Sequence, residues 1–174
     1  TIGTGIVSAR ASDPWTARLA VELFLTPFVA GWLVIGAFGA GYARLPLRPK
    51  YADAVLVLSI AGALPSGFLH IVHPAPHPWL PLAGRVGTLL VGVATLAFAF
   101  DMLRGRATRP LLALAAGAAL IKGIAEIGAG LGIALNLVGS PPVVIAYLHL
   151  VLLGMVTPIL ADALLGPARV VVPA

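Results

Sequence analysis

The sequence contains no cysteine and few charged residues. Only 10% of its 174 residues are Asp, Glu, Lys or Arg, whereas about a quarter of the residues in a soluble domain are charged. The absence of cysteine excludes disulfides, thiolate metal sites, iron–sulfur clusters and covalent c-type haem attachment. Histidine and carboxylate side chains are therefore the remaining candidate ligands for a metal or cofactor.

The apolar content of the chain predicts an integral membrane protein. Hydrophobic residues make up 60% of it, and its mean hydropathy is +1.04. Because a helical crossing needs about 20 apolar residues, the length fits a single all-α bundle of about five transmembrane helices joined by short loops. No separate soluble domain is expected within 1–174. The expected spans are 20–43, 52–72, 81–103, 111–137 and 142–165.

The distribution of basic residues predicts the orientation. Seven Lys and Arg residues lie in the loops at 44–51 and 104–109 and in the C-terminal tail, against three on the opposite side. Since cytoplasmic loops carry an excess of Lys and Arg, we expect the N-terminus outside and the C-terminus in the cytoplasm, in a prokaryotic cytoplasmic membrane. The net charge of +5 then reports orientation, and we expect no nucleic-acid partner.

The histidines suggest a cofactor site near the outer surface. His70 lies near the outer end of the second span and His149 about seven residues inside the fifth, which places both within about 5–10 Å of that surface. Two imidazoles at one depth are the usual arrangement for holding a b-type haem between helices. Arg85, at the outer start of the third span, could pair with a haem propionate. The sequence thus predicts a haem b site formed by His70, His149 and Arg85.

Copper is the competing cofactor. His70 and His73 are spaced i, i+3, and His77 could gather with them and His149 in a set of imidazole ligands, which suits copper and zinc. The prolines that follow His73 leave the geometry of this site open. A histidine in a membrane helix can also simply bond to a neighbouring hydroxyl or carbonyl, in which case the chain carries no cofactor.

A second candidate site lies in the fourth expected span. Lys122 and Glu126 stand at i, i+4 in the middle of this span, so they share one helix face. Pairing lets two opposite charges coexist in a low dielectric. One interpretation is an ion pair that fixes helix packing or subunit register. The other is a proton or substrate relay, extended toward the cytoplasm by Asp101 or Asp162.

The segment Tyr147-Leu-His149-Leu-Val-Leu-Leu-Gly154-Met-Val-Thr157 resembles histidine-bearing helices in small relatives of haem–copper oxidase subunit I and in NnrS-type haem and copper membrane proteins. In those families such histidines bind haem or copper, so the resemblance implies a ligand role for His149. This chain lacks the trio of further helix-buried histidines that a full haem–copper centre needs. The resemblance therefore implies a single-haem or accessory protein and not a terminal oxidase.

These patterns together predict a b-type cytochrome-like membrane subunit that holds haem near the outer face and passes electrons within a larger membrane complex. The expected partners are the lipid bilayer, other membrane subunits packed on glycine-rich helix faces, and quinone or a periplasmic electron carrier. The alternatives are a cofactor-free structural or assembly subunit and a small copper-handling or transport protein. No phosphate loop, nucleophile elbow or zinc helix is present in the sequence, so no motif assigns catalysis to this chain.

Overall fold

The computed structural model describes residues 27–45, 49–70, 77, 79–104, 109–133 and 140–165, and these residues form helices with no strand among them. In chain order the helices are the π-helix η1 (Pro27–Ile35), α3 (Gly36–Arg44), α4 (Ala52–Ser66), the 3₁₀-helix η2 (Gly67–His70), α5 (Trp79–Arg104), α6 (Pro110–Gly130), α7 (Pro141–His149), the π-helix η3 (Leu150–Val156) and α8 (Thr157–Leu165).

In the described part of the chain, four helical segments are long and apolar enough to cross a membrane: Ala52–Leu69, Trp79–Arg104, Pro110–Gly130 and Pro142–Leu165. The prediction of an all-helical, membrane-embedded protein is confirmed in this form. Of the expected first span, η1 and α3 cover the part from Pro27 onward, and residues 20–26 lie outside the described part of the chain. The count of five spans stays a prediction.

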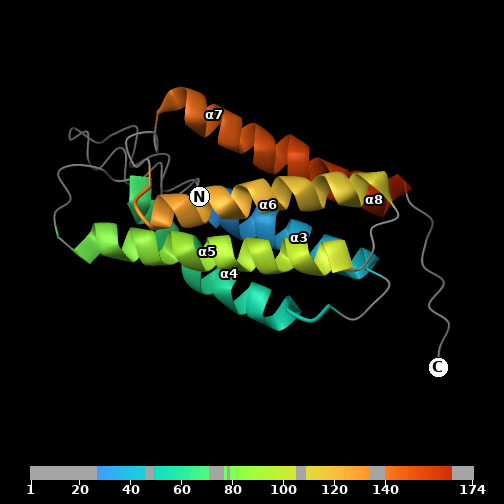
Figure 1. Ribbon diagram of the computed structural model, residues 1–174, viewed down its shortest axis with the longest axis horizontal. Helices are drawn as coiled ribbons and strands as arrows, with labels where there is room; N and C mark the ends of the chain where they lie inside the picture. Colours follow the sequence, from blue (N-terminus) through green and yellow to red (C-terminus); the bar gives the residue numbers. More distant parts are fainter. Residues whose placement is uncertain are drawn as a thin grey trace.

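Helix α5 lies between α4 and α6 in the bundle (Figure 1). Phe98 and Met102 of α5 are completely buried and belong to one core cluster with Met155 of η3 and Ile159 of α8, which are also fully buried. The Phe98 ring lies 4.3 Å from that of Phe38 in α3, between ring centroids. We refer to Phe98, Met102, Met155 and Ile159 as the apolar layer.

Glycines bring α4 and α5 into close contact. A Cβ atom at Gly87 would meet the backbone nitrogen of Ser66, and one at Gly84 would meet the backbone nitrogen of Leu69. On the facing helix, a Cβ at Gly62 would lie 2.6 Å from the carbonyl oxygen of Gly87. These positions therefore admit only glycine without separation of the two helices.

The glycines of the expected first span behave differently. Gly41 packs against Phe98, because a Cβ there would lie 2.8 Å from the ring. Among the described residues, nothing lies within 4 Å of such an atom at Gly36 or Gly39. Close packing within the described part of the chain is thus seen at Gly41 and not at Gly36 or Gly39.

Two helices end earlier than the sequence suggested. Helix α6 ends at Gly130, short of the expected 137, because Gly132 adopts a φ of 86°. The amides of Gly132 and Ile133 then bond to the carbonyls of Ala129 and Gly128, which is the Schellman arrangement that closes a helix. Helix α4 gives way to 3₁₀ geometry at Gly67, two residues after Pro65.

Candidate functional site

A cluster of four polar side chains lies inside the apolar bundle. Thr95 comes from α5, Lys122 and Glu126 from α6, and Tyr147 from α7; we call them the polar cluster. Thr95 is 0% exposed, Lys122 1% and Glu126 8%, and Tyr147 is partly buried. Ionisable groups at such depth in a membrane protein are costly and mark functional sites by default.

The carboxylate of Glu126 is the centre of this polar cluster. Its Oε1 accepts hydrogen bonds from Lys122 Nζ at 2.6 Å and from the Tyr147 hydroxyl at 2.8 Å. The Lys122 ammonium also donates to Thr95 Oγ1 at 3.2 Å. The single hydroxyl proton of Thr95 can go to the Val91 carbonyl at 2.8 Å or to Glu126 Oε2 at 3.3 Å. Oε1 of Glu126 thus accepts two hydrogen bonds, and Oε2 accepts at most one longer hydrogen bond.

Local helix energetics do not account for the pair. In an isolated helix, a Glu four residues before a Lys is the favourable order, and here Lys122 precedes Glu126. The favourable terms are therefore tertiary, from Thr95 of α5 and Tyr147 of α7. Bonds of this kind are needed to offset the desolvation of two buried charges.

The polar cluster lies off the centre of the bundle. At 1.5 Å per residue, Glu126 is about 6 Å and Lys122 about 12 Å along the axis from Gly130, where α6 ends. The sequence placed the pair at mid-span, and the early end of α6 explains the difference. On the other side the apolar layer separates the cluster from the helix ends that carry Arg44 and Arg109. We call those helix ends the basic end.

Tyr147 reaches Glu126 from a helix that is loosely attached. Residues 142–146 of α7 are exposed, and α7 continues directly into η3, so among the described elements it has few contacts outside its own span. In Figure 1, α7 stands apart from α6, and η3 and α8 bring the last span back to α6. The π-helical turn geometry of η3 begins at Leu150, directly after α7, and such segments are often found at functional sites.

Two other carboxylates tie the basic end together. Asp162 Oδ2 accepts from Arg44 Nε and from Arg109 Nη1, both at 3.0 Å. Asp101 accepts from the amide of Tyr51 at 2.8 Å and from the Tyr42 hydroxyl at 3.2 Å. Among the hydrogen bonds of the described residues, none joins either carboxylate to the polar cluster. A relay from Glu126 through Asp101 or Asp162 would have to cross the apolar layer.

The residues expected to bind haem lie as follows. His149 ends α7 with an exposed side chain, and its Nδ1 lies 2.7 Å from the Ile145 carbonyl oxygen. Because a carbonyl only accepts, Nδ1 carries the proton in this bond and Nε2 carries the lone pair. His70 is the last residue of η2, and its side chain lies outside the described part of the structure. All of His73 lies outside it as well.

The remaining predicted ligands are exposed. Arg85 lies in the first part of α5 with its side chain outward. The His77 ring is nearly parallel to that of Trp79, at 17° and 6.3 Å between centroids. Within the described ranges, no group of three or more His, Asp or Glu side chains is placed to hold a metal ion. Because the side chains of His70 and His73 lie outside the described residues, the predicted haem and copper sites stay predictions.

Thr95 and Tyr147 are the members of the polar cluster that sequence reasoning missed. The i, i+4 spacing of Lys122 and Glu126 can be seen in the sequence. The sequence does not show how α5 and α7 are rotated about their axes, and this rotation points the hydroxyls of Thr95 and Tyr147 at Glu126. The sequence signal is weak, because each residue is one of two hydroxyls in its apolar run, with Thr88 and Thr157 as the others.

Neither protein-family models, nor curated proteins, nor solved structures gave a match to this chain.

Proposed function

We propose that the chain is a subunit of a larger membrane complex, and that its polar cluster takes up and releases a proton. The observation that carries this proposal is the buried Glu126 carboxylate, held by three groups that each bear exchangeable protons. In the proposed topology of five spans, with the N-terminus outside and the C-terminus cytoplasmic, the near end of α6 faces outward. Protons then exchange with the outer side.

Tyr147 is the group that links Glu126 to the outside. Its phenol donates to Oε1 of Glu126 and can accept a hydrogen bond from water on its other side. One proton enters at the phenol oxygen while the phenol proton moves to Glu126, so the tyrosine ends unchanged. The neutral acid no longer compensates Lys122, which weakens the contact between α6 and α7.

The proposed exchange is one-sided. All four side chains of the apolar layer are 0% exposed, and they fill the bundle between the polar cluster and the basic end. Uptake and release then occur at the same face. The loosely packed α7 supports a role in which protonation of Glu126 moves the last span, as opposed to a channel through the bundle.

Infrared difference spectroscopy of the protein in lipid vesicles tests this proposal. Lowering the external pH is expected to produce the carbonyl stretch of a protonated carboxyl group, and Glu126→Gln is expected to abolish it. Asp53→Asn, an exposed carboxylate at the start of α4, is the matched control and keeps the band. A band that survives in Glu126→Gln, or no carboxyl protonation at all, would mean that Lys122 and Glu126 are a fixed packing pair.

A second candidate function is the b-type cytochrome role, with which the exposed His149 is compatible, although the same bond to a carbonyl also fits a histidine that holds no cofactor. The bond from Nδ1 to Ile145 leaves Nε2 free as a ligand, and a fixed second-nitrogen bond is typical of metal-binding histidines. His149 would supply one nitrogen ligand to a haem, and Arg85 would bind a propionate. When bound, haem would supply one-electron transfer. A second ligand would come from His70 or from a neighbouring subunit.

A reduced-minus-oxidised visible spectrum tests this second function. One b-type haem per chain is expected, and His149→Ala is expected to lose it. His77→Ala, which changes an exposed histidine outside α7, is the control and retains it. Metal analysis of the same sample checks copper as the alternative. A folded sample with neither haem nor copper would leave a cofactor-free subunit.

A further inference from the structure

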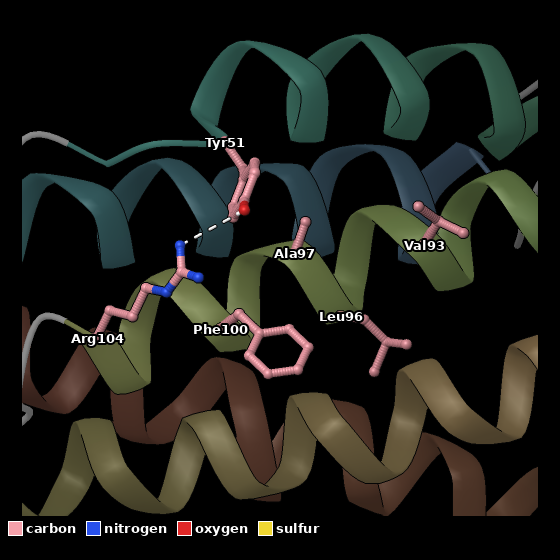
Figure 2. A pocket seen from close by; sticks show the side chains of 6 residues that line it. All are labelled: Tyr51, Val93, Leu96, Ala97, Phe100 and Arg104. Atoms are coloured by element: carbon pink, nitrogen blue, oxygen red, sulfur yellow. Dashed lines mark hydrogen bonds between the residues drawn. The ribbon is translucent and has the colours of Figure 1, made fainter.

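A hollow of about 340 Å³ lies on the surface of α5 toward the basic end. Figure 2 shows that Tyr51 and Arg104 lie at one end of it and Val93 at the other. The hollow is separate from the polar cluster. It is lined by Tyr51, Val93, Leu96, Ala97, Phe100 and Arg104.

The floor of the hollow is an apolar stripe along one helix face. Positions 93, 96, 97, 100 and 104 follow the spacing that places residues on one side of a helix. From Val93 to Arg104 the stripe is about 16 Å long at 1.5 Å per residue. Val93 and Phe100 are 47% and 52% exposed within this chain, so the stripe faces the hydrocarbon of the bilayer.

The end of the stripe is cationic. Lys50 Nζ and Arg104 Cζ lie 5.2 and 5.6 Å from the centroid of the Tyr51 ring. Neither cation belongs to an ion pair among the described residues. The amide of Tyr51 donates to Asp101 at 2.8 Å, which holds the backbone of this residue in place. Two cations without an ion-pair partner among the described residues thus lie near the Tyr51 ring, where the helix leaves the membrane.

We propose that this groove binds an anionic phospholipid from the leaflet at the basic end. Its phosphate lies between Lys50 and Arg104, and one acyl chain follows the stripe from Phe100 to Val93. The occupant is argued from charge and shape together. A soluble anion has no acyl chain to pack on the apolar floor. A zwitterionic lipid carries a positive charge in its head group, which the two basic side chains repel. Basic sites beside transmembrane helices bind anionic head groups in this manner.

Native mass spectrometry of the detergent-solubilised protein tests the proposal. Dioleoyl phosphatidylglycerol is expected to bind more tightly than dioleoyl phosphatidylcholine. The double variant Lys50→Gln/Arg104→Gln is expected to lose about thirtyfold in affinity for the glycerol lipid, from about 1 kcal/mol per basic residue near the membrane surface. Arg85→Gln, an exposed cation at the other end of α5, is the matched control and should bind as the wild type does.

Two further measurements separate the possible sources of the anion. Ala97→Phe keeps both charges and fills the groove, so it should weaken lipid binding as well. Glycerol phosphate, which has no acyl chain, should bind at least tenfold more weakly than the lipid. Equal binding of the two lipids, an unchanged double variant, or glycerol phosphate as tight as the lipid would each overturn the proposal.

Discussion

At the scale of single residues, the buried pair on α6 shows that the cost of a charge depends on its partner. Lys122→Met is expected to destabilise the protein by about 3–5 kcal/mol, because it leaves Glu126 as an uncompensated buried charge. The double variant Lys122→Met/Glu126→Leu should lie much closer to the wild type, since an ion pair and apolar residues of similar volume are often equivalent.

Unfolding in mixed detergent micelles measures this difference in free energy. The third member of the cycle is Glu126→Leu, which leaves Lys122 unpaired and should resemble Lys122→Met. If the double variant were as unstable as the single ones, the pair would be contributing specific tertiary bonds that apolar packing cannot replace.

The titration of Tyr51 offers a second test at this scale. Arg104, whose Nη1 lies 3.5 Å from the phenol oxygen, and then Lys50 lower the pKa of Tyr51 below its ordinary value of 10.0. Because the pKa is lowered, ionised Tyr51 stabilises the folded state fully above the pKa of the unfolded chain, and this stabilisation is lost as the pH falls through the pKa of the folded protein. Arg104→Gln should raise the pKa of Tyr51 toward 10.0.

Absorbance titration of tyrosinate measures this change, with Tyr51→Phe to assign the signal. The chain has three tyrosines, and Tyr51 is the one that precedes a membrane span. An unchanged titration in Arg104→Gln would show that Lys50 alone sets the acidity of Tyr51.

What the sequence reveals about single residues is limited to their own helix. The spacing of Lys122 and Glu126 predicts their contact, and the structure confirms it at 2.6 Å. The contacts of Asp101 with Tyr42 and with the amide of Tyr51 link separate helices, so no local pattern announces them. The Nδ1 bond of His149 likewise depends on a rotamer and not on a spacing.

At the scale of elements, glycine sets the distance between α4 and α5. Gly87→Ala is expected to destabilise the protein by about 1–3 kcal/mol, because its methyl group would meet the backbone at Ser66 and push the helices apart. Gly117→Ala is the control: nothing lies within 4 Å of a Cβ there, and replacing a helical glycine should stabilise by about 0.5–1 kcal/mol.

Thermal unfolding of both variants in the same detergent measures the two effects. We expect the change in the free energy of unfolding to have opposite signs for Gly87→Ala and Gly117→Ala, although the chemical change is the same. Equal and small effects would mean that α4 and α5 separate freely in the folded protein.

Apolar length predicts the existence of the helices better than their ends. The third span was expected at 81–103 and α5 runs from Trp79 to Arg104, because uninterrupted apolar residues determine it. The fourth was expected to reach 137, but Gly132 stops α6 through a left-handed turn. Because the residues after Gly132 are also apolar, the sequence does not show that α6 ends there. The early end of α6 places Lys122 and Glu126 nearer to the helix end than the sequence predicts.

At the scale of the whole molecule, the basic residues gather at one end as the alternation of spans predicts. Arg44 ends α3 and Arg109 precedes α6, and both bond to Asp162 of α8. Lys50 and Tyr51 join the same end through Asp101 of α5. These contacts fix which helix ends lie together. The side of the membrane that this end faces follows only from the excess of positive charge.

Thiol labelling determines that side, because the chain contains no cysteine of its own. Asp53→Cys places an exposed thiol at the basic end, and His77→Cys places one at the opposite end. With a membrane-impermeant maleimide added outside intact cells, His77→Cys should react and Asp53→Cys should react only after the cells are opened. The reverse labelling pattern would mean that the orientation in the membrane is opposite to the predicted one. The polar cluster would then exchange protons with the cytoplasm, and the phospholipid groove would lie in the outer leaflet.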